Sequence, residues 1–134
     1  MKTTADPLDE LVADTKSKSR EKLRDILFGK VNLDTEGGFL ILPEYRTGDR
    51  NARHVVLVAL LAQLAVSLRS EGLSAAALTP KDIEKATALK GGTIRPALKR
   101  LKAKGLVVPE GKAYAVHESS LNLAQGELEG SSDD

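Results

Sequence analysis

The sequence feature that most constrains the fold is the apolar stretch from Arg53 to Arg69, RHVVLVALLAQLAVSLR. From Val55 onward, its only interior polar residues are Gln63 and Ser67. A helix that is apolar nearly all round must be buried on more than one side. Two readings follow: the helix is the core of the domain, with an N-terminal helix covering one face, or a second subunit covers part of it. We favour a mixture of the two.

Other properties of the chain narrow its class. The longest uninterrupted apolar run, residues 55–62, is far shorter than the roughly 18 residues that a membrane span needs, so we expect a soluble protein. The N-terminus, MKTTADPLDELV, carries acidic residues where an export signal needs an apolar core, which favours a cytoplasmic location. The absence of cysteine excludes disulfides and thiolate metal sites.

Charge is distributed unevenly along the chain. The formal net charge is only +1, but residues 79–104 carry 8 Lys/Arg and 2 Asp/Glu, a net +6. Residues 105–134 carry 1 Lys/Arg and 6 Asp/Glu, a net −5. Such a concentration of positive charge on one short element suggests an anionic partner, although a solvated helix face is the simpler reading.

The N-terminal half divides into two predicted segments. Asp6-Pro7 is a typical helix start, and we predict a helix from Pro7 to Phe28 within an N-terminal segment of residues 1–30, with a break near Ser17 as an alternative. Residues 31–53 form a second, short hairpin or linker segment. There, residues 31–33 are expected to pair with the apolar run 39–42 across a Gly-Gly turn.

We predict that residues 54–117 form a third segment. After the apolar helix, it contains two short helices and a hairpin. Thr79-Pro80 places a threonine cap before a proline at the first helical position. After a turn at residues 88–91, a second helix turns four apolar residues inward at spacing i, i+3, i+4, i+7, namely Ile94, Ala97, Leu98 and Leu101. We expect Thr93 to be its N-cap, with Pro96 at the third helical position. Residues 106–109 and 113–116 then predict a β-hairpin, and residues 118–134 an acidic, largely disordered tail.

This order resembles the winged helix-turn-helix superfamily, in particular MarR-like and ArsR-like regulators. The resemblance lies in LTPKDIEKATALKGGTIRPALKRLKAKGLVV and the hairpin after it, about residues 78–116. It implies a mainly α fold with a small β-hairpin, here with an N-terminal helical and hairpin extension. It also implies binding to double-stranded DNA, as a transcriptional regulator and as a homodimer. For ArsR-like metal sensing the chain lacks the ligands, and we expect neither a metal nor another cofactor.

The candidate DNA-binding residues follow from the helix geometry. A helix fits the major groove with its N-terminal residues toward the base edges, and its free amides favour phosphate. With its apolar residues inward, the second helix presents Arg95 for guanine and Lys99, Arg100 and Lys102 for phosphates. The complete set of candidates is Lys81, Lys90, Gly92, Thr93, Arg95, Pro96, Lys99, Arg100, Lys102 and Lys112.

Two other functions compete with DNA binding. A winged helix also serves as a protein-interaction adaptor, here with the N-terminal helix and the segment FLILPEYR as contact surfaces. An enzyme is disfavoured, because His54 and His117 lie in unrelated contexts and the sequence shows no set of nucleophile, base and orienting group. We also expect the acidic tail to fold back on the basic helix and to weaken non-specific DNA binding. The target site and any small-molecule effector are open.

Overall fold

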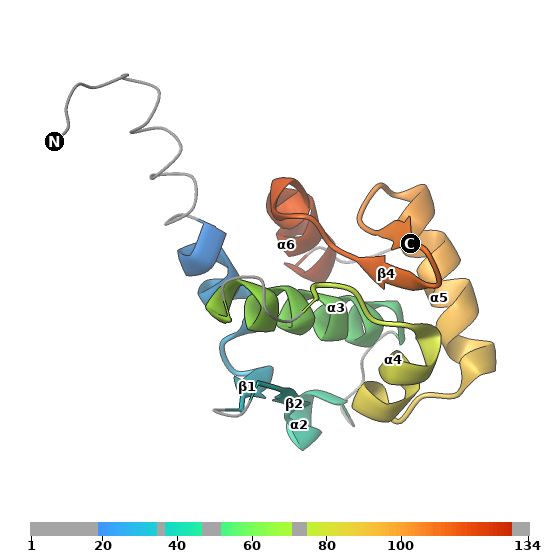
Figure 1. Ribbon diagram of the computed structural model, residues 1–134, viewed down its shortest axis with the longest axis horizontal. Helices are drawn as coiled ribbons and strands as arrows, with labels where there is room; N and C mark the ends of the chain where they lie inside the picture. Colours follow the sequence, from blue (N-terminus) through green and yellow to red (C-terminus); the bar gives the residue numbers. More distant parts are fainter. Residues whose placement is uncertain (1–18, 35–36, 47–51, 71–74, 130–134) are drawn as a thin grey trace, which may run out of the picture.

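The computed structural model describes residues 19–34, 37–46, 52–70 and 75–129. The chain is mainly helical with two small antiparallel hairpins (Figure 1). A helix over residues 19–27 is followed by β1 (Val31–Leu33), β2 (Phe39–Ile41), α2 (Pro43–Arg46), α3 (Ala52–Arg69), α4 (Pro80–Thr87), α5 (Gly91–Ala103), β3 (Val108–Glu110), β4 (Ala113–Ala115), a 3-10 turn η1 (Glu118–Ser120) and α6 (Leu121–Glu129).

Helix α3 lies at the centre of the molecule, with the other elements packed around it (Figure 1). Every residue from Val55 to Ala62 is buried, at 2% exposure or less. The contacts come from α4, α5 and α6, from both hairpins and from the N-terminal helix, whose Leu23 and Ile26 join the same core. The prediction that this helix is the core of the domain is therefore confirmed over residues 55–62, which are buried by other elements of the same chain.

By length and composition alone, α3 could also cross a membrane. Most of the helix is buried against other elements of the protein, and a core helix of a soluble protein has the same properties. The helix is less buried near its C-terminal end, where Ala65 and Leu68 are only partly covered.

The N-terminal hairpin forms as the sequence predicts. Val31 pairs with Ile41 and Leu33 with Phe39 in an antiparallel register. Pro43 does more than end the strand, because it also begins the short helix α2. The predicted helix is confirmed only over residues 19–27. Its first part lies outside the described residues.

Helix α4 begins with a complete capping box. The Thr79 hydroxyl accepts a hydrogen bond from the Asp82 amide, and the Asp82 carboxylate accepts one from the Thr79 amide. The helix ends at Ala88, which has φ 63° and ψ 15°, the left-handed conformation that usually falls to glycine. This residue sets the angle at which the chain turns from α4 into α5.

Helix α5 begins three residues earlier than predicted. Its N-cap is Lys90 (φ −87°, ψ 156°), not Thr93, and the glycines that we assigned to the turn form its first turn. The amides of Thr93 and Ile94 both donate to the Lys90 carbonyl, which fixes this start. Pro96 is therefore the sixth helical residue and lies inside the helix, where the missing amide leaves the Gly92 carbonyl without its i+4 donor.

The second hairpin follows α5 in the chain and packs against α3 through β4. Its first strand, Val108–Glu110, starts two residues later than predicted, because Leu106 and Val107 are buried in the core where the chain leaves the helix. The two strands meet at a tight turn with Gly111 and Lys112 at its tip. Leu78 forms two backbone hydrogen bonds with Tyr114, so the segment before α4 pairs with β4 through one antiparallel bridge. The predicted winged helix-turn-helix arrangement is thus confirmed.

The prediction of a largely disordered tail is wrong for residues 118–129. They form η1 and α6, and Leu121 and Ala124 are buried in the common core. The apolar residues of this segment, spaced three residues apart along a helix, were enough to dock it despite its acidic composition. The last residues, 130–134, lie outside the described residues.

The left-handed residue between α4 and α5 gives a stability prediction. Ala88→Gly should raise the free energy of unfolding by about 0.5–1 kcal/mol, since glycine adopts this conformation without the strain of a Cβ atom. Urea denaturation measures the change. Ala86→Gly, two residues earlier inside α4, is the matched control and should destabilise by about 1 kcal/mol. A loss of stability in Ala88→Gly would contradict the prediction.

Candidate nucleic-acid interface

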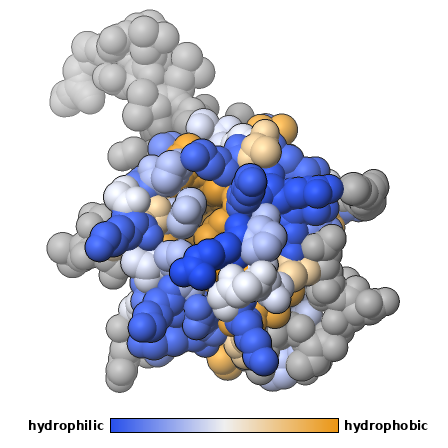
Figure 2. All heavy atoms as spheres, turned by 90° about the vertical axis from the view of Figure 1, so that its right-hand side faces the viewer, coloured by the Kyte–Doolittle hydropathy of each residue, from blue (hydrophilic) through white to orange (hydrophobic). Residues whose placement is uncertain are grey.

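The exposed side of α5 is the candidate interface. Ile94, Ala97, Leu98 and Leu101 are buried as predicted, so the remaining residues of the helix face outward. All ten candidates are exposed: Lys81, Lys90, Gly92, Thr93, Arg95, Pro96, Lys99, Arg100, Lys102 and Lys112. Figure 2 views the molecule from the side on which α5 lies. Hydrophilic residues cover most of this face, around a hollow in which apolar residues are visible.

The outward residues of α5 form two stripes along the helix. Arg95, Lys99 and Lys102 follow one another at spacing i, i+4, i+7, which places them on one side. Thr93, Pro96 and Arg100 form the other stripe and line a shallow hollow of 230 Å³ together with Ala52 and Arg53 at the start of α3. The second stripe is thus next to the N-terminus of α3.

The cations of this surface have few acidic partners within the protein. Within the part of the chain that the structure describes, no ion pair involves Arg95, Lys99, Arg100 or Lys102, and α5 contains no acidic residue. The Arg95 guanidinium and the Glu84 carboxylate both lie beside Gly91, where a Cβ atom would be 3.0 Å from Glu84 Oε2 and 3.5 Å from Arg95 Nη1. Glycine at this position leaves room for both side chains.

The first turn of α5 also presents free backbone groups. The amides of Gly91 and Gly92 donate no hydrogen bond within the described residues, and the side chain of Lys90 does not cap the helix. A Cβ atom on Gly92 would meet open space, so a partner can approach this backbone closely. Free amides at the positive end of a helix favour an anion such as a phosphate.

The other candidates lie on neighbouring elements. Lys81 is on α4, Lys90 is in the turn and Lys112 is at the tip of the wing. The wing itself carries no net formal charge, because Glu110 in β3 balances Lys112; Glu110 Oε2 is 3.2 Å from His117 Nε2. Sequence reasoning omitted Lys85, an exposed cation in the last turn of α4. Its position in the sequence between Lys81 and Lys90, both of them candidates, could have indicated it.

A buried carboxylate that the sequence did not reveal links the tail to the interface. Glu127 on α6 accepts a hydrogen bond from Arg53 Nε at 2.7 Å and one from Lys104 Nζ at 3.0 Å, and its Oε2 is 3.1 Å from His54 Nε2. Its side chain is only 10% exposed. The acidic tail therefore does reach the basic helix, but at its C-terminal end, where it occupies Lys104.

These contacts change the titration of Glu127. Burial raises the pKa of its carboxyl group, but the hydrogen bonds and positive charges of Arg53 and Lys104 outweigh that effect. The net pKa is lower than the usual value of 4.5. The charged form is thus the one that the folded protein stabilises.

The described residues show no cluster of three or more potential metal ligands. His54 pairs with Glu127, and His117 pairs with Glu110 at the wing. Neither histidine has a nucleophile as its hydrogen-bond partner.

Comparison with known proteins adds one likeness. No protein-family model matches the sequence, and no curated protein matches it. Among solved structures, the chain is similar to BpsR of Bordetella bronchiseptica, whose DNA binding is regulated by 6-hydroxynicotinic acid. The identity is 18%, the TM-score is 0.41, and the match covers 96% of this chain and 76% of BpsR. We therefore base the function on the residues of this chain.

The ion-pair network around Glu127 predicts a pH-dependent stability. Glu127→Gln should lower the free energy of unfolding by about 1–3 kcal/mol at pH 7, because the buried Arg53 then loses the ion pair that the Glu127 carboxylate forms with it. Because the folded pKa is lowered, the contribution is complete above about pH 4.5 and is lost as the pH falls through the folded pKa. Urea denaturation at pH 7 and pH 3 measures it. If wild type and Glu127→Gln differed in their free energy of unfolding by the same amount at pH 7 and at pH 3, the prediction would be refuted. Glu129→Gln on the exposed side of α6 is the control.

The internal proline of α5 gives a second stability prediction. Pro96→Ala should raise the free energy of unfolding by about 1–2 kcal/mol, since it restores the amide that the Gly92 carbonyl lacks. Pro80→Ala is the matched control, because Pro80 is at the first position of α4, where a missing amide costs nothing. Thermal unfolding of both variants provides the comparison. If the unfolding temperature shifted equally in the two variants, Pro96 would be tolerated in its helix as well as Pro80 is.

Proposed function

We propose that this protein binds double-stranded DNA through α5 and acts as a transcriptional regulator. The observation that carries the proposal is the exposed side of α5, where Arg95, Lys99, Arg100 and Lys102 lack acidic partners among the described residues. This helix is also the one that a helix-turn-helix presents to the major groove.

The residues have different roles in the proposed complex. Arg95 is in the second turn of α5, and its guanidinium has the fork geometry that recognises the O6 and N7 atoms of guanine. Lys99 and Lys102 continue the same stripe away from the helix start, which suits phosphate contacts. The free amides of Gly91 and Gly92 add a second phosphate site at the start of the helix.

The proposal includes a homodimer in the cytoplasm. Two copies of a winged helix meet two half-sites of duplex DNA about one helical turn apart. Since residues 55–62 are already buried within one chain, the dimer contact lies outside the apolar centre of α3. Light scattering coupled to size exclusion determines the oligomeric state.

The alternative is an adaptor that binds another protein through the N-terminal hairpin and helix. The observation that favours it is the exposure of apolar side chains in this part of the chain: Phe28 is 83% exposed and Leu40 is 56% exposed. In an adaptor, the cations of α5 would not form a specific DNA interface, and their removal would leave binding to its protein partner unchanged.

A salt titration tests the DNA-binding function. Fluorescence anisotropy with a random duplex should give an affinity that falls steeply from 50 to 200 mM salt, because binding releases counterions. Lys99→Ala combined with Lys102→Ala should weaken binding and reduce the slope of log K against log salt by roughly 2. Arg95→Ala should relax selectivity in a binding-site selection, at a cost of about 1–3 kcal/mol on the preferred sequence.

The control is Arg24→Ala, which removes an exposed arginine on the N-terminal helix, at the opposite end of α3 from α5 (Figure 1). It should bind as the wild type does. Salt-independent binding by the wild type, or an unchanged slope in the double variant, would exclude this function and leave the adaptor.

A further inference from the structure

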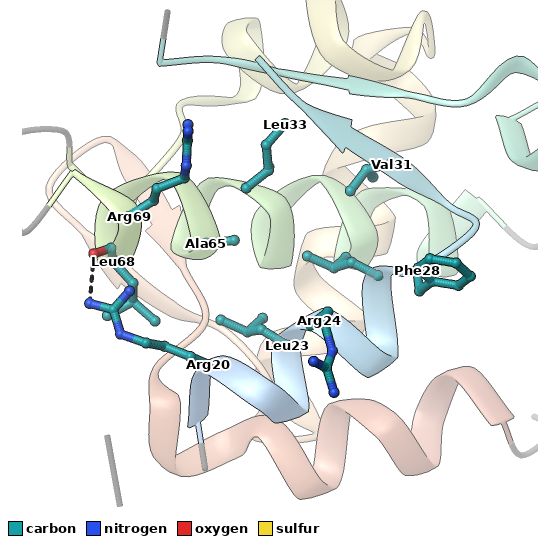
Figure 3. Close-up of a pocket in the computed structure, with 10 residues that line it drawn as sticks. Arg20, Leu23, Arg24, Phe28, Val31, Leu33, Ala65, Leu68 and Arg69 are labelled. Atoms are coloured by element: carbon teal, nitrogen blue, oxygen red, sulfur yellow. Dashed lines mark hydrogen bonds between the residues drawn. The ribbon is translucent and has the colours of Figure 1, made fainter. Parts of the chain in front are cut away.

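An apolar pocket of 290 Å³ lies at the C-terminal end of α3, between the N-terminal helix and β1 (Figure 3). Leu23, Leu27 and Val31 form its buried floor. Ala65 and Leu68, on the less buried end of α3, and the partly exposed Leu33 form its sides. None of these residues belongs to the proposed DNA interface. The volume is close to the lower end of the range for small-molecule sites.

The two ends of the pocket differ in chemistry. Arg20 and Arg69 both lie at the end where α3 terminates, with their side chains extending to different sides of it, and Phe28 lies at the opposite end (Figure 3). The Arg20 guanidinium donates to the Leu68 carbonyl at 3.0 Å, and Arg69 donates weakly to the Asp34 carbonyl at 3.4 Å. Among the described residues, neither guanidinium has an ion pair. Each retains free N–H donors and an uncompensated positive charge.

The third arginine at the rim does not share this property. Arg24 pairs with the neighbouring Asp25 at 3.2 Å, and its side chain points away from Ala65 and Leu33 (Figure 3). The positive potential is therefore concentrated at the Arg20 and Arg69 end. A ligand that fits this arrangement has one anionic head and a linear apolar body.

The length of the pocket limits the size of that body. Residues 20 to 28 span eight residues of helical chain, which corresponds to about 12 Å at a rise of 1.5 Å per residue. An extended alkyl chain advances about 1.25 Å per carbon–carbon bond, so roughly eight to ten carbons fill this length. The lining is aliphatic except for Phe28, which suits an alkyl chain.

We propose that this pocket binds a medium-chain alkyl carboxylate, with the carboxylate at Arg20, the chain directed toward Phe28, and Arg69 adding positive charge at the carboxylate end. An arginine fork recognises a carboxylate by two parallel hydrogen bonds, and the apolar floor removes the chain from water. The site is independent of the proposed DNA interface, so either can fail without the other.

Isothermal titration with three ligands of equal length tests the head group: octanoate, octan-1-ol and octylammonium. Octanoate should bind at least tenfold more tightly than the alcohol, and octylammonium should not bind. From hexanoate to nonanoate, affinity should rise about threefold to fourfold per methylene group and then level off near ten carbons, where the pocket ends.

Variants locate the site. Arg20→Met combined with Arg69→Met keeps the aliphatic stems and should reduce octanoate affinity at least tenfold while the weak binding of octan-1-ol stays the same. Ala65→Met fills the pocket and should abolish binding of both. Arg24→Met is the matched control and should bind octanoate as the wild type does. Thermal unfolding of each variant checks that the protein stays folded.

Several results would overturn the proposal. Equal affinity for octanoate and octan-1-ol would show that the arginines do not select an anion. Unchanged octanoate binding in Ala65→Met would place the ligand elsewhere. No binding to the wild type, together with a dimer that Phe28→Ser converts to a monomer, would show that a second copy covers the pocket.

Discussion

The fold depends on the burial of α3. This helix has apolar side chains on nearly its whole circumference, so it is stable in water only when every side is covered. The N-terminal helix, both hairpins, α4, α5 and α6 each cover part of it. Because one core joins all these elements, the hollow beside α5 and the apolar pocket are built at opposite ends of the same helix.

The position of α5 follows from that packing. Its four apolar residues fix which side is buried, and the cations occupy the side that remains. Two tertiary devices set its direction. The left-handed Ala88 turns the chain out of α4, and the Glu127 network ties Lys104, just past the end of α5, to Arg53 and His54 at the start of α3. The acidic tail therefore supports the helix structurally at one end.

Local pattern predicted much of the architecture. The Thr79 cap, the first hairpin and the inward residues of α5 were predicted from short spacings, because caps, turns and amphipathic faces depend on residues close in sequence. The start of α5 was predicted wrongly, since proline at position 96 suggested a first-turn location, whereas the backbone at Lys90 sets the boundary. The exposed position of the ten candidate residues agrees with the prediction, and their function stays a proposal.

The sequence by itself determined a mainly helical chain with one fully apolar helix and a basic helix-turn-helix, because periodicity and charge are properties of neighbouring residues. Only the tertiary structure decided three other features. It covered α3 within one chain, docked residues 118–129 through Leu121 and Glu127, and brought Arg20 and Arg69 to one end of an apolar pocket. Two of the contacts in these features, Arg20 with Leu68 and Arg53 with Glu127, join residues 48 and 74 positions apart, and no local spacing encodes such contacts.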